Sequence, residues 1–178
     1  VRIYPTPEQV DFLNQQFGAV RFAYNKALRI ISTQYRRHGV SLKARKDIKP
    51  LLAIAKKSRK YHWLNQYDSI SLQQAVINLG KAFDNFFDKK KGFGYPKFKR
   101  KHGEQKSYHC TSVSVTDNYI KIPKIKTPIP ANIHREIGGK VKSITISRTV
   151  TGKYYASILV DDGQEAPKTT KTVSRITG

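Results

Sequence analysis

The hydrophobic periodicity of the chain changes across one basic stretch, KKKGFGYPKFKRKHG, residues 89–103. Before this stretch, apolar residues recur every three or four positions, and after it they recur at every second position. It holds seven basic residues and no acidic one, and its glycines and Pro96 disfavour a regular helix. We interpret it as a basic connector between a helical part and a strand part, which predicts an α+β fold.

Upstream of the connector, local signals divide the sequence into amphipathic helices. Thr6 as an N-cap, Pro7 at the first helical position and Glu8 in the first turn mark the beginning of the first one. We expect Gly18 to break this stretch into a short helix and a longer one, and Gly39 to end the second.

Two more helices are expected before the connector. The third covers residues 43–57 and is interrupted near Pro50. Asp68 caps the fourth. The apolar face of this fourth helix consists of Leu72, Ala75, Val76, Leu79, Phe83, Phe86 and Phe87.

Downstream of the connector, the period of two predicts antiparallel strands. Residues 107–115 and 119–125 flank a turn at 116–118, and residues 141–149 and 153–160 flank a Thr-Gly turn typical of a hairpin. Between the two pairs we expect a proline-containing loop, residues 127–139. The polar stretch 161–178 is expected to be mobile.

The charge of the chain points to a polyanionic partner. There are 34 Lys and Arg against 12 Asp and Glu, a formal net charge of +22, and nucleic acid is the polyanion whose phosphates such a surface neutralises. A membrane partner is not expected, because no basic amphipathic helix has a continuous apolar face and no apolar run reaches transmembrane length. The single cysteine, Cys110, fits a reducing compartment, so we expect a cytoplasmic, nucleoid-associated protein.

The sequence contains no recognisable catalytic motif. Metal-dependent nucleases need several carboxylates that converge on divalent ions, and none of the twelve acids here belongs to a recognisable metal-binding motif. His109 adjoins Cys110, but neighbouring side chains on a strand point to opposite faces. We expect no metal site and no catalytic residue within this sequence.

Candidate residues for binding nucleic acid occur in two places in the sequence. In the connector, Phe93, Tyr95 and Phe98 are candidates for base stacking, interleaved with lysines that suit phosphates. Anchoring of Phe93 and Phe98 on the helical core is an equally weighted alternative. At the start of the fourth helix, Ser69 and Gln73 project together near the positive end of the helix dipole.

A series of ordered motifs carries a resemblance to a known family. The motifs are RIYPTPEQ (2–9), GAVRFAYNKAL (18–28), SxxLQQA (69–75), NFF (85–87), YPKFK (95–99), QKSY (105–108), KIPK (121–124) and SRTxTGKYYAS (147–157). In this order and spacing they resemble the N-terminal half of TnpB, also called OrfB, the transposon-encoded family of RNA-guided DNA endonucleases. The likeness covers nearly the whole chain.

The resemblance implies an architecture. Residues 1–4 would be the remnant of the first strand of a wedge domain, and residues 5–104 a helical bundle, the recognition lobe, with a helix-turn-helix-like start. Residues 105–165 would complete the wedge domain as a small antiparallel β-barrel. Residues 166–178 would be a linker toward a RuvC-like nuclease domain.

The resemblance also implies partners, namely a guide RNA and target double-stranded DNA, with sequence specificity left mostly to base pairing. Reading of a short DNA motif would fall on Ser69, Ile70 and Gln73, with Thr111 and Ser112 as further contributors. The residues that would contact the nucleic-acid backbone are Lys89, Lys90, Lys91, Lys97, Lys99, Arg100, Lys101, Arg148 and Lys153.

The sequence departs from the family at its end, since it stops at Ile176-Thr177-Gly178, before the aspartate that opens the nuclease domain. We therefore expect no cleavage by this chain alone, no cofactor within it, and divalent metal and zinc only in the C-terminal part of the family. A monomer is expected. Two alternatives stay open: a stand-alone regulator or transposase accessory protein that binds DNA through a helix-turn-helix in residues 6–38, and a structural RNA-binding protein.

Overall fold

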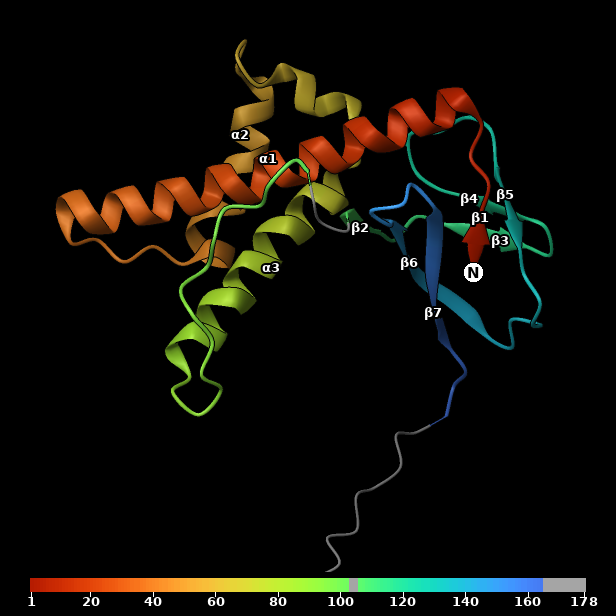
Figure 1. Ribbon diagram of the computed structural model, residues 1–178. Helices are drawn as coiled ribbons and strands as arrows, with labels where there is room; N and C mark the ends of the chain where they lie inside the picture. Colours follow the sequence, from red (N-terminus) through yellow and green to blue (C-terminus); the bar gives the residue numbers. More distant parts are fainter. Residues whose placement is uncertain (103–105, 165–178) are drawn as a thin grey trace, which may run out of the picture.

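A computed structural model describes residues 1–102 and 106–164, which form a helical half followed by an antiparallel sheet (Figure 1). The chain is therefore α+β, as predicted. The helices are α1 (Pro7–His38), η1 (Ala44–Ile48), α2 (Leu51–Lys57), η2 (His62–Gln66) and α3 (Ser69–Phe87). The strands are β1 (Arg2–Ile3), β2 (Lys106–Cys110), β3 (Ser114–Thr116), β4 (Tyr119–Lys121), β5 (Ile129–Asn132), β6 (Lys140–Arg148) and β7 (Tyr154–Asp161).

Helix α1 is one uninterrupted helix of 32 residues, roughly 48 Å long, and it extends from the helical half across to the sheet (Figure 1). Its predicted ends are confirmed. Thr6 and Gln9 form a reciprocal capping box, and Gly39 closes the last turn with a left-handed φ of 65°. The predicted break at Gly18 is wrong. Phe17 and Ala19, which flank that glycine, are both buried, and their packing holds the helix together through it.

The middle of the helical half consists of short pieces and then α3. The predicted interruption near Pro50 is confirmed, because it separates the π-helical turn η1 from α2. The 3₁₀ turn η2 was not predicted. Helix α3 begins after Asp68, as predicted, and crosses α1 in Figure 1.

The seven strands form one sheet in the order β2-β6-β7-β1-β5-β4-β3. The predicted closed barrel is wrong for the part of the chain that the structure describes, because β2 and β3 lie at opposite ends of this order and do not pair. The β6–β7 hairpin is confirmed, and Gly152 occupies its turn with a φ of 84°. The predicted loop 127–139 contains strand β5, which pairs with β1 and β4.

Strand β1 lies in the middle of the sheet, although it has only two residues. Ile3 pairs with Ala131 on one side and with Tyr154 on the other, and its side chain is only 2% exposed. The buried residues of helices and strands form one continuous core, in which Phe17 of α1 meets the Tyr108 ring of β2 edge-on at 5.4 Å. The two-part domain division stays a prediction.

Across residues 1–102 and 106–164, no helix has both the length and the apolar character that crossing a membrane requires.

Candidate nucleic-acid interface

The first part of the candidate interface is built on the N-terminus of α3. The Asp68 carboxylate accepts hydrogen bonds from the backbone N–H groups of Ile70 (3.4 Å) and Ser71 (3.0 Å), which satisfies two of the free donors of the first turn. The Ser71 hydroxyl contacts both this carboxylate and the carbonyl of His109, at 2.7 Å from the carbonyl. The helix start is thus tied to strand β2.

Beside this helix start lies an open groove of about 720 Å³ between α2, η2 and α3. Two of the predicted motif-reading residues, Ser69 and Gln73, line one side of it. Its other lining residues include Lys49, Lys56, Lys57, His62 and Asn65, and none of its lining residues is acidic. The groove therefore presents hydrogen-bonding side chains beside positive charge, a combination that suits a nucleic acid.

Lys56 is held in this groove by a hydrogen bond, and its surroundings shift its pKa. Its ammonium group donates to the Ser69 hydroxyl. Partial burial lowers the pKa of Lys56, the nearby Lys124 lowers it further, and the Asp68 carboxylate opposes both effects. An anion in the groove would favour the charged form of Lys56.

The other predicted motif-reading residues are not in the lining of this groove. Ile70 is 40% exposed on the first turn of α3. Thr111 and Ser112 follow β2, the strand that Ser71 contacts through the His109 carbonyl. The structure therefore brings Ser69 and Gln73 together in the groove. It places Ile70 on the same helix outside the groove lining, and Thr111 and Ser112 on the segment after β2.

The second part of the interface is the connector, which runs back along α3 to α1 (Figure 1). Asn25 of α1 holds the connector by two hydrogen bonds to the backbone of Lys99, donating to its carbonyl (3.0 Å) and accepting from its N–H (2.8 Å). The Lys99 ammonium lies 4.5 Å from the centre of the Tyr24 ring. This part of the connector is thus fixed on the helix without regular secondary structure.

Tyr95 anchors the middle of the connector. Its ring meets the rings of Phe83 and Phe86 edge-on at 5.5 and 5.3 Å, and its hydroxyl lies 3.0 Å from the Ser32 hydroxyl. Phe93 and Phe98 are 60% and 53% exposed. Anchoring therefore accounts for Tyr95, and base stacking by the three aromatic residues stays a prediction.

A groove of about 440 Å³ runs between the connector and α1. Lys97 and Phe98 line it from the connector, and Arg29 and Arg36 line it from α1. Cations from the connector and from α1 therefore border the same groove.

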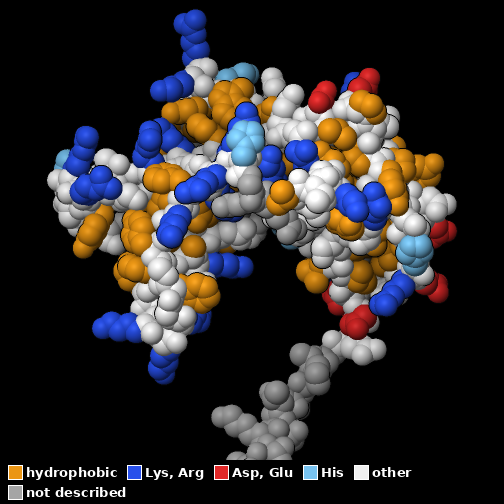
Figure 2. All heavy atoms as spheres, viewed as in Figure 1, with side chains coloured by type: hydrophobic (Ala, Val, Ile, Leu, Met, Phe, Trp, Pro, Cys, Tyr) orange, Lys and Arg blue, Asp and Glu red, His pale blue; other side chains and the backbone are white. Residues whose placement is uncertain are grey.

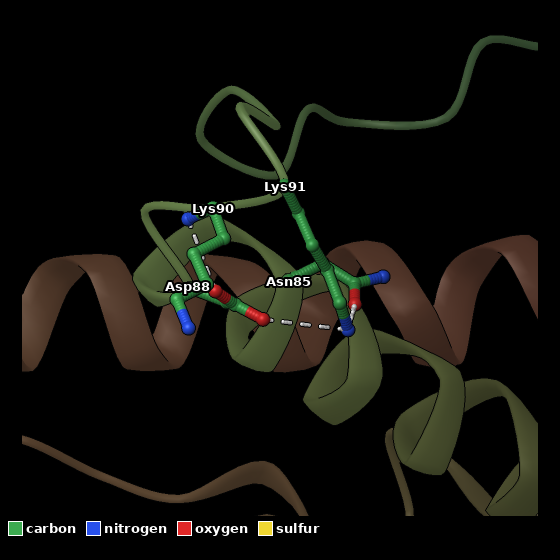
Figure 3. Close-up of polar contacts among 4 residues, drawn as sticks. All are labelled: Asn85, Asp88, Lys90 and Lys91. Atoms are coloured by element: carbon green, nitrogen blue, oxygen red, sulfur yellow. Dashed lines mark hydrogen bonds and ion pairs between the residues drawn. The ribbon is translucent and has the colours of Figure 1, made fainter. Parts of the chain in front are cut away.

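The lysines at the beginning of the connector differ in their surroundings (Figure 3). The Lys91 ammonium donates to the Asn85 side chain at 3.0 Å and lies 3.7 Å from the Asp88 carboxylate. The backbone N–H of Lys90 also donates to Asp88, at 3.1 Å, and its side chain is exposed, as is that of Lys89. Lys91 is thus partly neutralised at the end of α3.

The two predicted backbone-contact residues of the β6–β7 hairpin also differ. Arg148 is half-buried, its Nη1 donates to Asn14 at 3.3 Å, and its guanidinium lies 5.8 Å from the centre of the Tyr154 ring. Lys153 is exposed beside the turn. Arg148 is therefore positioned by helix α1, and Lys153 projects from the sheet.

The face drawn in Figure 2 shows an uneven distribution of charge. Basic side chains lie over both halves, and the acidic side chains visible there lie over the sheet half. Within the described ranges, only two ion pairs form, Lys91 with Asp88 and Lys142 with Asp161. Most of the excess positive charge on the described residues is thus not neutralised by acids of the same chain.

The described residues contain no group of three or more His, Cys, Asp or Glu side chains close enough to hold a metal ion. Cys110 is buried, its thiol donates to the Ile144 carbonyl at 3.4 Å, and burial raises its pKa to about 12.

Comparison with known proteins gives matches along most of the chain. The OrfB/IS605 family model described as a helix-turn-helix domain matches residues 1–39, which here form β1 and the continuous helix α1. A virulence protein of Salmonella dublin, VsdF, is 63% identical over 110 residues, which are 58% of this chain and 92% of that protein.

Two longer proteins named "Putative RNA-guided DNA endonuclease" also match. The protein from Streptomyces pristinaespiralis is 32% identical over 97% of this chain, and InsQ from Escherichia coli strain K12 is 28% identical over 93% of it. This chain spans 43% and 40% of their lengths, respectively, which is less than half of each.

Proposed function

Because this chain belongs to the TnpB/OrfB family of transposon proteins and corresponds to the N-terminal part of its members, we propose that it is the part that holds a guide RNA and recognises target DNA. The observation that carries the proposal is the groove at the start of α3. Ser69 and Gln73 face lysines there, and no lining residue is acidic.

This groove suits recognition of a short DNA motif. Gln side chains discriminate bases because they both donate and accept hydrogen bonds at a base edge, and lysines beside them contact phosphates without regard to sequence. In the proposal Ser69 and Gln73 read bases, and Lys49, Lys56 and Lys57 hold the backbone. Ile70 would contribute from the first turn of α3, and Thr111 and Ser112 from the segment after β2.

The connector suits the backbone of a guide RNA or of its heteroduplex with DNA. Lys97 and Phe98 lie across a groove from Arg29 and Arg36, so cations from two segments face one space. A protein that leaves sequence specificity to base pairing needs contacts of this kind, to shape and to charge.

The alternative of a stand-alone helix-turn-helix regulator is supported by the family model that matches residues 1–39, but the helix there is continuous. Such a motif needs two helices that meet at an angle through a short turn. Residues 7–38 form a single helix instead, without a turn at Gly18.

We predict that Gln73 and the connector cations affect binding differently. Gln73→Ala should relax the preferred DNA motif by about 1–3 kcal/mol for each base that Gln73 reads. Lys97→Ala combined with Arg100→Ala should weaken binding to all sequences and flatten its salt dependence. A binding selection from a randomised DNA duplex library, followed by titrations at several salt concentrations, measures both effects.

Gln74→Ala is the matched control, because Gln74 is the next residue on α3 and its side chain donates to Asn78 at 2.9 Å outside the groove. It should leave both the motif and the affinity unchanged. If Gln73→Ala and the connector variant had the same effect in the selection, the division between base-reading and backbone-binding residues would be wrong.

The guide-RNA part of the proposal has its own test. An RNA–DNA heteroduplex of about 20 base pairs should bind more tightly than a DNA duplex of the same sequence. Equal affinity for the two duplexes would favour a DNA-binding protein that works without RNA.

A further inference from the structure

Five cationic residues from four separate segments meet at one small site beside the middle of α1. Arg21 of α1, Lys99 and Arg100 of the connector and Lys106 of β2 line a cavity of about 110 Å³. Arg148 of β6 lies close by, because β2 and β6 pair at Lys106 and Arg148. Residues 21 and 148 are more than a hundred positions apart, so only the folded chain brings these charges together.

Nothing acidic among the described residues lines this cavity, whose other lining residues are Phe17, Val20 and Ser107. Neither of the two ion pairs of the described residues involves Arg21, Lys106 or Arg148. Arg21, Lys106 and Arg148 are all half-buried, so water screens their mutual repulsion less than it would on an open surface. A bound anion would relieve this repulsion between the three cations.

The guanidinium group of Arg148 also lacks a hydrogen-bond partner at one of its nitrogen atoms. Its Nη1 has a partner in Asn14, at 3.3 Å, but its Nε is buried without a hydrogen-bond partner. A buried N–H group without a partner costs free energy that a bound acceptor would recover.

The charge state of Lys106 agrees with this geometry. Burial lowers its pKa first, and then the charges of Arg148, Arg21 and Lys101 lower it further. A lowered lysine pKa means that folding disfavours the charged form of Lys106.

We propose that the cavity lined by Arg21, Arg100 and Lys106, with Arg148 beside Lys106, is a binding site for one phosphate group of a nucleic-acid backbone. The volume supports a single group, because about 110 Å³ is well below the roughly 300–1,000 Å³ of sites for drug-sized ligands. The connector wall of the site is held by Asn25, so it is formed before a ligand arrives. The inference rests on the proposed function, and it adds Arg21 and Lys106 to the binding residues.

The test is Lys106→Met, which keeps the length of the side chain and removes its charge. Titrations use two fluorescein-labelled probes of about 20 base pairs, a DNA duplex and an RNA–DNA heteroduplex. The variant should bind roughly tenfold more weakly, as expected for the removal of one charge-assisted hydrogen bond, and on the DNA duplex its salt slope should fall by about 0.9. A weakening on one probe alone would identify which backbone supplies the phosphate.

A second measurement separates a binding role from a structural one. Without ligand, Lys106→Met should raise the melting temperature in low salt, because the repulsion is relieved. Inorganic phosphate should raise the melting temperature of the wild-type chain more than that of the variant. Lys121→Met is the matched control, an exposed lysine on strand β4, and should change none of these quantities.

The outcomes distinguish this site from the proposed function. If the wild-type chain binds the probes and Lys106→Met keeps its affinity and salt slope, the phosphate site is refuted and the proposed function stands. If the wild-type chain binds neither probe, the proposed function fails. A phosphate-dependent melting shift that Lys106→Met abolishes would still support the site.

Discussion

Asp68 shows how much one residue contributes at this interface. Its carboxylate caps α3 and contacts the Ser71 hydroxyl, and its backbone N–H donates to the Gln16 side chain of α1 at 3.1 Å. The same carboxylate is the one charge that opposes the lowering of the Lys56 pKa. A buried acid thus holds the helix start in place and supports the charge of the groove beside it.

Cys110 permits a prediction at the same scale. With a pKa raised to about 12 by burial, its thiol should stay protonated at pH 8 in the folded chain. We expect almost no reaction with a thiol-specific reagent such as DTNB at pH 8, and rapid reaction after unfolding in guanidinium.

The sign of the pH dependence follows from the same shift. Since the pKa in the folded chain lies above the ordinary thiol value of 9.0, folding favours the protonated thiol, and this contribution to stability is complete below pH 9. It should be lost as the pH rises from about 9 to about 12. Rapid modification of the folded chain at pH 8 would contradict the burial of the thiol.

At the scale of elements, the two glycines of α1 have opposite roles. Gly18 lies in the helix interior, and a Cβ added there would meet no atom within 4 Å. Gly39 ends the helix with a φ of 65°, a conformation that side chains disfavour.

We therefore predict opposite effects of the same substitution. Gly18→Ala should stabilise the chain by about 1 kcal/mol, because alanine is the better helix former, and Gly39→Ala should destabilise it by about 1 kcal/mol. Urea unfolding followed by circular dichroism measures both. Destabilisation by Gly18→Ala would indicate a turn at this position and would restore the helix-turn-helix interpretation.

Local signals predicted the ends of elements better than their continuity. Thr6, Pro7, Gly39 and Asp68 were interpreted correctly because capping is decided by nearby atoms. Gly18 was misinterpreted, since the cost of a glycine in a helix is only about 1 kcal/mol and buried neighbours outweigh it.

Strand β5 was missed because Pro130 within it is typical of a loop. Pro130 lacks an N–H, but its carbonyl accepts from the N–H of Tyr4 at 2.8 Å, so the residue still joins the sheet. Proline therefore removes one backbone hydrogen-bond donor from a strand, but it can still be part of that strand.

The candidate site could be predicted only where its residues are close in sequence. Ser69 and Gln73 share a helix face, so their spacing predicted that they act together. The site of Arg21, Lys106 and Arg148 depends on long-range packing of α1 against β2 and β6, which no local pattern indicates.

At the scale of the whole molecule, Ile3 joins the two parts of the sheet. Strands β5, β4 and β3 connect to β7, β6 and β2 through β1. Ile3 is 2% exposed at this junction.

We predict that Ile3→Ala lowers the free energy of unfolding by about 2–5 kcal/mol, because the cavity would lie where the two parts of the sheet meet. Val150→Ala is a suitable control, since Val150 is 72% exposed in the β6–β7 turn and its truncation should have little effect. Chemical denaturation of both variants gives the comparison. Equal stability of the two would mean that the sheet does not depend on β1.

The central place of β1 has a consequence for synthesis on the ribosome. Arg2 and Ile3 are translated early, yet their partners are residues 131–132 and 154–155. The helices can pack as soon as they emerge from the ribosome. Strand β1 stays unpaired until the β6–β7 hairpin has left the exit tunnel. A chain released before that point would keep its helical lobe and lack the strand that unites its sheet.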